Sequence, residues 1–207
     1  MNKRFYISIC LLISFILSTG FKPQEKKLNI LYIHTHDTGS YIEPYGYDVA
    51  TPNMQKLAEQ GILFRNHFST FPTCSPSRGC LLTGRYPISN GLYGLAHRGF
   101  KLNDYNRHIV NYLKKHGYVS ALAGVQHVVD HHNKNAWQII GYDEHIGGTW
   151  SRNDMDKVIE WLENAPEKPF FLSVGFGETH RKFPPHNWQE ESEHVNPPGY
   201  LPNVPAT

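Results

Sequence analysis

The sequence predicts an α/β fold with a largely parallel central sheet flanked by helices. Short apolar segments typical of strands alternate along the chain with longer segments that carry helical periodicity. Three of the predicted strands are followed directly by histidine or acidic residues. In open α/β sheets, sites form just beyond the carboxyl ends of the strands, so the chain is expected to carry its site at one edge of the sheet.

The predicted strands are short apolar segments, most of them rich in β-branched and aromatic residues. They span residues 28–34, 62–68, 118–125 and 169–176. The polar side chains that follow the first, third and fourth of them are His36 and Asp37, His127, and Glu178 and His180. Because parallel strands end at the same edge of a sheet, we expect these side chains to meet.

The predicted helices have residues at their ends that favour helix boundaries. Pro52 suits the first turn of the first helix, and Gly84 and Gly117 end the second and third. Asn153 can cap the fourth. The four helices span residues 52–60, 77–83, 104–116 and 154–164.

Composition excludes several classes of protein. The 207 residues are 40% hydrophobic, which is enough for one domain with a buried core. The 20 basic residues are nearly balanced by 18 acidic residues, and no basic patch stands out along the sequence. No nucleic acid partner is therefore expected. Three cysteines at scattered positions do not form a disulfide scaffold. No apolar run reaches the roughly 18 residues that span a bilayer, so no stable membrane anchor is expected.

Residues 1–20 have the pattern of a secretory signal peptide. Lys3 and Arg4 form a positive start, residues 5–17 are nearly all apolar, and the small residues before position 21 suit cleavage. A buried or membrane-anchoring helix is the alternative. Residues 21–27 then form a polar linker, and the mature protein is expected in a periplasm or outside the cell.

The segment CSPSRGCLLTGR at residues 74–85 resembles the signature of the type I, formylglycine-dependent sulfatases. The similarity extends from about residue 29 to residue 180 and looks closest to sulfamidases and bacterial glycan sulfatases. It implies an alkaline-phosphatase-like sandwich, with residues 28–207 as the N-terminal portion of its catalytic domain. The proline-rich end of the chain suggests that this domain is incomplete at its C-terminus, and little or no activity is expected of the 207 residues alone.

The resemblance implies that a maturation enzyme reads Cys74-x-Pro-x-Arg78 and oxidises the cysteine to formylglycine (3-oxoalanine). The hydrated aldehyde attacks sulfur with one hydroxyl and later expels sulfate through the other. Physical chemistry agrees with this role, because the N-terminus of a helix and a guanidinium both favour an oxyanion. An unmodified thiol is the alternative for Cys74. Cys80 is expected to pack in the core.

The resemblance also implies one divalent cation, usually Ca²⁺. Asp37 matches one of its ligands, with a helix or turn cap as the alternative for this residue, and residue 74 is another ligand. His36 stands where the family has a second aspartate, and imidazole suits Mn²⁺ or Zn²⁺ better than Ca²⁺. Either the metal differs, or His36 binds sulfate, or the site is weakened. His34 is expected to pack within its strand.

Two further histidines match catalytic positions of the family. His127 closes a Gly-Val-Gln-His segment where the family often has Gly-Lys-x-His, so Val125 lacks the charge of that lysine. His180 is expected to bind sulfate and protonate the leaving atom, a role that a pKa near neutrality suits. His97 is a weaker candidate for substrate binding, and His131 with His132 is expected to form a surface turn. A structural role remains the alternative for each.

These observations predict a hydrolase that acts on sulfated sugars or glycosaminoglycans. A phosphate or phosphonate hydrolase of the alkaline phosphatase superfamily is one alternative, which assays on aryl sulfate and aryl phosphate would distinguish. A truncated or inactive glycan-binding relative is another. Val125 and His36 favour that reading, and it predicts binding of sulfated oligosaccharides without turnover.

Overall fold

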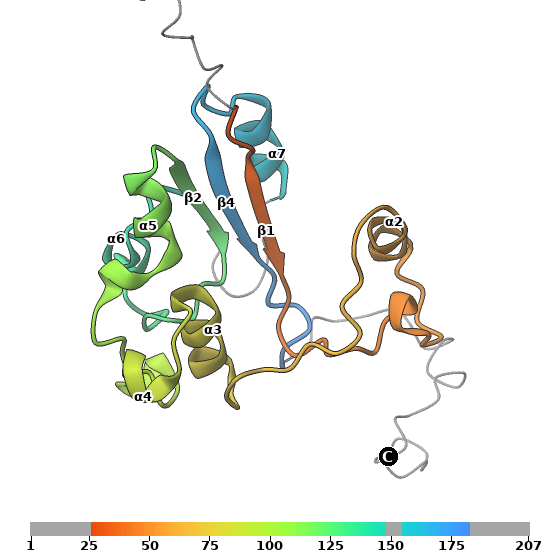
Figure 1. Ribbon diagram of the computed structural model, residues 1–207, viewed down its shortest axis with the longest axis horizontal. Helices are drawn as coiled ribbons and strands as arrows, with labels where there is room; N and C mark the ends of the chain where they lie inside the picture. Colours follow the sequence, from red (N-terminus) through yellow and green to blue (C-terminus); the bar gives the residue numbers. More distant parts are fainter. Residues whose placement is uncertain (1–25, 148–154, 183–207) are drawn as a thin grey trace, which may run out of the picture.

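The protein forms a four-stranded, fully parallel sheet with strand order β1-β4-β2-β3 (Figure 1). The computed structural model describes residues 26–147 and 155–182. The strands are β1 (Ile30–His34), β2 (Val119–Gly124), β3 (Glu144–Gly147) and β4 (Phe170–Gly175). The predicted class is confirmed, and the parallel strands require the chain to cross over between them through helices.

Helices cover the sheet on both faces (Figure 1). The α-helices are α2 (Pro52–Gln60), α3 (Cys74–Thr83), α4 (Pro87–Asn90), α5 (Ile109–Lys115), α6 (Ala136–Ile140) and α7 (Met155–Glu163), and the short 3₁₀ helices are η1 (Glu43–Tyr45), η2 (Ala96–Arg98) and η3 (Tyr105–Arg107). None of the helices in these described stretches combines the length and apolarity needed to cross a membrane.

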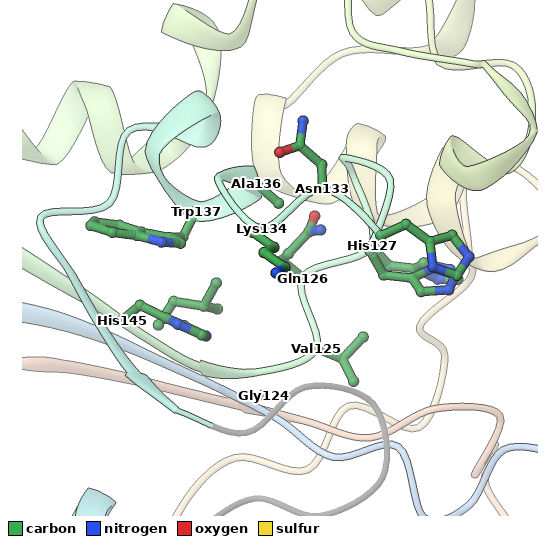
Figure 2. A pocket seen from close by; sticks show the side chains of 12 residues that line it. Gly124, Val125, Gln126, His127, Asn133, Lys134, Ala136, Trp137 and His145 are labelled. Atoms are coloured by element: carbon green, nitrogen blue, oxygen red, sulfur yellow. The ribbon is translucent and has the colours of Figure 1, made fainter.

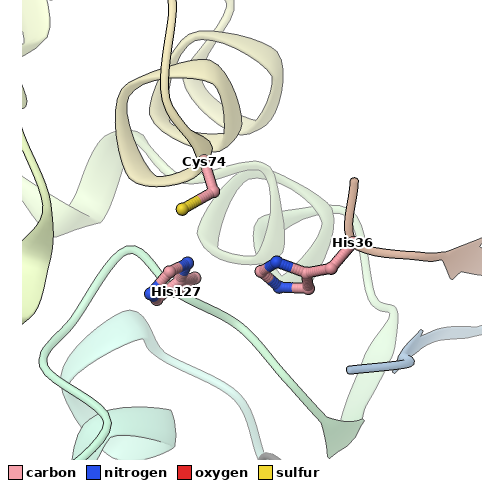
Figure 3. Close-up of side chains that lie close together, drawn as sticks. All are labelled: His36, Cys74 and His127. Carbon is pink, nitrogen blue, oxygen red and sulfur yellow. The ribbon is translucent and has the colours of Figure 1, made fainter. Parts of the chain in front are cut away.

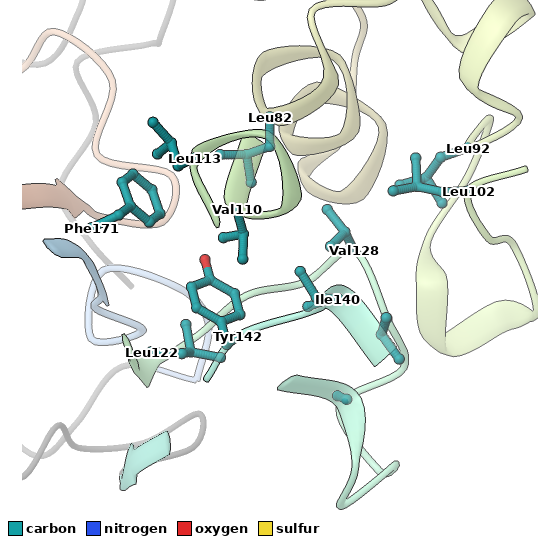
Figure 4. Close-up of a cluster of buried hydrophobic side chains, with 12 residues drawn as sticks. Leu82, Leu92, Leu102, Val110, Leu113, Leu122, Val128, Ile140, Tyr142 and Phe171 are labelled. Carbon is teal, nitrogen blue, oxygen red and sulfur yellow. The ribbon is translucent and has the colours of Figure 1, made fainter. Parts of the chain in front are cut away.

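Two hydrophobic clusters lie on opposite faces of the sheet. Leu122 and Phe171 pack with Val110 of α5 and Ile140 of α6 on one face (Figure 4). The neighbouring strand positions, among them Leu172, point to the other face and pack against α7. Alternation along a strand sends neighbouring side chains to opposite faces, so strands with apolar residues at consecutive positions must be covered on both.

The register of the central strand β4 aligns the ends of three strands. β4 pairs with β1 through Ile30–Phe171 to His34–Gly175, and with β2 through Val119–Phe170 to Gly124–Gly175. His34, Gly124 and Gly175 therefore lie at one level, and the segments that follow them leave the sheet side by side. This confirms the expected convergence of strand ends.

The strand predicted at residues 62–68 is wrong. The described structure has no strand there, and Ile62, Phe64 and Phe68 expose 82%, 65% and 81% of their surface. Apolar and aromatic composition favours a strand only where a neighbouring strand supplies hydrogen bonds, and this segment runs outside the sheet. The sequence reading also missed α6 and β3, whose residues are too few to show a clear period.

Two predicted helices have different boundaries. α3 begins earlier than expected, at Cys74. The helix predicted at 104–116 is divided into η3 and α5, because His108 adopts an extended conformation and its Nδ1 accepts a hydrogen bond from the Val110 amide at 3.2 Å. Histidine is not among the usual N-caps, so the pattern concealed the break. The proposed cap Asn153 of α7 lies outside the described residues.

The buried cap makes stability depend on pH. Burial lowers the pKa of His108 to about 4, whereas an unfolded histidine titrates near 6.5. Between these values the unfolded chain binds the proton and the folded chain does not, so the free energy of unfolding falls as pH is lowered from about 6.5 to about 4. His108→Asn keeps a cap acceptor but does not titrate in this range. We expect its free energy of unfolding, measured by urea denaturation, to fall less steeply as pH is lowered from about 6.5 to about 4. An unaltered slope would contradict the assignment.

Candidate active site

Three strand ends bring three histidines to one place. His36 follows β1, His127 follows β2 and His180 follows β4. The ring centroids of His36 and His127 lie 5.2 Å apart, and those of His36 and His180 lie 5.5 Å apart. The residues that the sequence singled out at separate strands thus form one cluster.

Cys74 completes this cluster from the opposite side. It is the first residue of α3, as the anion-binding argument requires, and it is half-buried. Its Sγ and one nitrogen each of His36 and His127 all lie within 4.8 Å of one another (Figure 3). Burial raises the pKa of the thiol, and backbone hydrogen bonds with Ser75 and Cys74 itself act in the opposite direction. Cys80 is buried at 5% exposure, which confirms its role in packing.

Arg78 lies one turn along α3 and is held against the end of β1. Its Nη1 lies 2.5 Å from His34 Nδ1, and its Nη2 donates to the Thr35 carbonyl at 3.2 Å. Burial, with a smaller contribution from the charge of Arg78, lowers the pKa of His34 to about 3. The neutral His34 ring accepts the guanidinium hydrogen bond, so His34 positions Arg78 in addition to packing within its strand.

Both histidines beside Cys74 are neutral at physiological pH. Burial, with a smaller contribution from the charge of Arg78, lowers the pKa of His36 to about 3 and that of His127 to about 4. A neutral imidazole offers one lone pair and one N–H group. The two rings can therefore bind a metal or hydrogen-bond a substrate oxygen, but they add no positive charge.

Asp37 and His180 lie at the outer rim of the cluster. His180 Nε2 is 3.7 Å from Asp37 Oδ2, and the Asp37 side chain is 61% exposed. The loops that carry them are joined by a 3.1 Å hydrogen bond between Thr38 and Thr179, and Thr179 also donates to the His36 carbonyl. The order of these loops thus depends on both β1 and β4.

Cys74, Arg78 and Asp37 line one open cavity of about 410 Å³. The other lining residues are Tyr32, His34, Thr35, His36, Ser69, Phe71, Pro72, Thr73, Ser77 and Leu81. The cavity combines a helix N-terminus, a fixed guanidinium and a carboxylate at its rim. Such a set can hold an oxyanion and one cation together.

Val125 and His97 do not lie in this cavity. Val125 is buried at 5% exposure, and its amide donates to the Gly175 carbonyl at 3.1 Å. An apolar side chain packed in this way supplies no charge to the site. His97 is exposed on η2 and stacks on His127 with ring centroids 6.0 Å apart, so the structure connects it to the cluster through His127.

A second cavity of about 330 Å³ lies on the other side of His127 (Figure 2). Val125, Gln126 and Lys134 line it together with Trp137, whose ring stacks on His145 at 6.2 Å. His131 and His132 also line it, and both are exposed, in agreement with the expected surface turn. No sequence pattern indicated this cavity, because it forms between a loop and the α6 region, which periodicity did not detect.

Comparison with known proteins agrees with this geometry. Residues 28–203 match the family model described as Sulfatase. An ulvan-active sulfatase of Formosa agariphila is 30% identical over 189 residues, which cover 83% of this chain and 29% of the relative. An N-acetylglucosamine-6-O-sulfatase of Bacteroides thetaiotaomicron is 29% identical over 195 residues, which cover 84% of this chain and 34% of the relative. Human N-sulphoglucosamine sulphohydrolase is 32% identical over 139 residues, covering 64% and 28%.

Solved structures show the same fold. A structure described as a complex with its substrate D-glucosamine-2-N,6-O-disulfate superposes with a TM-score of 0.64 and 26% identity, covering 77% of this chain and 36% of that one. A Pseudoalteromonas sulfatase superposes with a TM-score of 0.58, covering 77% and 45%, and its 24% identity supports the fold alone. The chain thus spans about a third of the curated relatives it matches. With an alkaline-phosphatase-like fold and a family match over most of its length, the chain belongs to the sulfatase family.

Proposed function

We propose that the protein hydrolyses sulfuric esters or sulfamates of sulfated glycans, with residue 74 acting as formylglycine. The position of Cys74 carries this proposal: it begins α3, faces His36 and His127, and shares a cavity with Arg78. The relatives named for ulvan and for N-acetylglucosamine 6-sulfate support sulfated sugars or glycosaminoglycans as the substrate class.

Residue 74 would supply the nucleophile. A hydrated aldehyde has two hydroxyl groups, so one can attack sulfur while the other remains to release sulfate as the carbonyl forms again. The start of α3 directs its dipole at this position, and Arg78 adds a fixed positive charge. Both favour the negative charge that moves onto the bridging atom as the S–O or S–N bond breaks.

His127 and His180 would manage the protons. Neutral His127 lies beside residue 74 and can hydrogen-bond one of its hydroxyls. His180 stands at the rim, next to Asp37, where the leaving sugar has room to depart. We assign His180 as the group that protonates the leaving oxygen or nitrogen.

The residues present fit a divalent cation held by Asp37, His36 and residue 74. A bound cation would polarise the sulfate oxygens. Among the described residues that line the cavity, Asp37 is the one carboxylate. Ca²⁺ prefers six to eight oxygen ligands, so the nitrogen of His36 favours Mn²⁺ or Zn²⁺ over the expected Ca²⁺.

The replacement His36→Asp tests this preference. It adds a carboxylate beside Asp37, and we expect the Ca²⁺ affinity to rise by about 10- to 100-fold because a hard cation gains an oxygen ligand. Isothermal titration with Ca²⁺ measures the change. His36→Ala is the matched control, since it removes the imidazole without supplying an oxygen ligand. Equal gains in both variants would argue against ligation by residue 36.

Mass spectrometry of the peptide that contains residues 74–78 tests the proposed function directly. The protein should carry formylglycine at residue 74 when it is produced in a host that contains the formylglycine-generating maturation enzyme. Prepared in that host as part of a complete catalytic domain, it should release sulfate from sulfated sugars and leave aryl phosphate intact. A plain thiol in that host, or preference for the phosphate, would overturn the proposal. We further propose that residues 1–20 direct export to a periplasm or to the exterior.

A further inference from the structure

A second group of metal-binding side chains lies on the outer side of His127. It consists of His97 on η2, His127 after β2, and His131 in the loop before α6. One nitrogen from each ring lies within 4.8 Å of the other two. Two members of this His97–His127–His131 triad, His127 and His131, line the second cavity.

The spacing of the rings is close to that of a three-histidine zinc site. With Zn–N bonds of about 2.0–2.1 Å in tetrahedral geometry, ring centroids lie about 5.2 Å apart. The centroids here are 5.5 Å apart for His97–His131, 6.0 Å for His97–His127 and 6.3 Å for His127–His131. Each pair must close by roughly 1 Å or less to reach the bound geometry. His97 and His131 are exposed, so their side chains have room for this movement.

The backbone around the triad is ordered by its own hydrogen bonds. Gln126 Oε1 accepts from the amides of Val128 and Val129 at 2.6 and 2.8 Å. Asp130 Oδ1 accepts from the His132 amide at 3.0 Å. These bonds order the backbone from Gln126 to His132. Binding of an ion therefore has to order the exposed side chains of His97 and His131 but does not have to change the loop. Preorganisation of this kind reduces the entropy lost on binding.

We propose that His97, His127 and His131 bind a Zn²⁺ ion, with water as the fourth ligand. Three imidazoles match Zn²⁺ and offer little to Ca²⁺ or Mg²⁺, which require oxygen ligands. The site is separate from the cation held by Asp37, and it does not depend on the proposed hydrolysis. Because the two groups share His127, a zinc ion here adds two positive charges beside residue 74 and restricts the rotation of the His127 ring.

Zinc titration of the intact protein tests this site, in a Cys74→Ala background that removes the thiol of the neighbouring cluster. Isothermal titration should show binding of Zn²⁺, and Co²⁺ as a spectroscopic substitute should give the visible bands of a four-coordinate site. We expect His97→Ala and His131→Ala each to weaken binding by about tenfold or more. His132→Ala is the matched control and should leave the affinity of this site unchanged, whereas His36→Ala should affect only an ion held with Asp37.

Three outcomes would overturn the proposal. Loss of the four-coordinate Co²⁺ bands in His36→Ala, with none in His97→Ala and His131→Ala, would place the ion at the active cavity. A loss in His132→Ala without one in His97→Ala would place it on the turn formed by Asp130 to His132. Equal affinity in every variant would mean nonspecific binding. Circular dichroism on each variant separates loss of ligand from loss of fold. Sulfate release is a separate measurement, so an inactive protein with the expected zinc pattern would refute only the proposed function.

Discussion

Cys74→Ala should lower the rate at which a complete catalytic domain releases sulfate by about 10⁴-fold or more, because it removes the precursor of the nucleophile. The remaining groups of the cavity can bind sulfate but supply no hydrated aldehyde to attack it. The helix start tolerates alanine, so the thermal unfolding temperature should change little. Steady-state release of sulfate from a sulfated monosaccharide, at fixed metal concentration, measures the effect.

The neighbouring Cys80 gives the matched control. It lies on the same helix, is 5% exposed, and its Sγ is 3.9 Å from Asn90 Nδ2. Cys80→Ala should reduce the free energy of unfolding by about 1 kcal/mol through lost packing, while kcat and the modification of residue 74 persist. Comparable activity losses in both variants would show that the effect of Cys74 is structural.

Arg78→Ala should lower kcat/KM for sulfate esters by about 10²- to 10³-fold, since the buried guanidinium is the fixed cation of the cavity. Arg78→Lys should restore only part of this loss. A lysine can keep the charge but cannot reproduce the two directed hydrogen bonds to His34 and Thr35. Sulfate inhibition constants, measured alongside kcat/KM, would report the lost anion binding independently of turnover.

A second readout distinguishes positioning from simple destabilisation. The charge of Arg78 contributes to the low pKa of His34, so the pKa of His34 should rise from about 3 in Arg78→Ala, as followed by NMR. Arg85→Ala, an exposed arginine just beyond the same helix, should alter neither this pKa nor activity. An unchanged His34 pKa in Arg78→Ala would contradict the contact on which the assignment rests.

Local sequence patterns predicted the strands that are apolar throughout and the helix whose start is marked by a proline. Apolar runs predicted the strands β1, β2 and β4, and the proline in its first turn predicted α2. The same reasoning failed for residues 62–68, where apolar residues remain exposed without a neighbouring strand. It also failed at His108, because a histidine cap is indistinguishable from helix interior by periodicity.

The candidate site was predicted residue by residue but not as an arrangement. His36, His127 and His180 were each expected at a strand end, and Cys74 at a helix start. The hydrogen bond from Arg78 to His34, the burial of Val125 and the histidine triad on the outer side of His127 were not expected. Each of these depends on neighbours that lie far away in the chain.

The sequence by itself determined the α/β class, the modification motif at residues 74–78 and the family, because these depend on local composition and spacing. Only the tertiary structure decided which side chains share a cavity. That outcome depends on β4 lying between β1 and β2 in a register that aligns their carboxyl ends. A shift of one residue in that register would send every side chain of the shifted strand to the other face of the sheet, so no local pattern could have specified the distances between His36, Cys74 and His127.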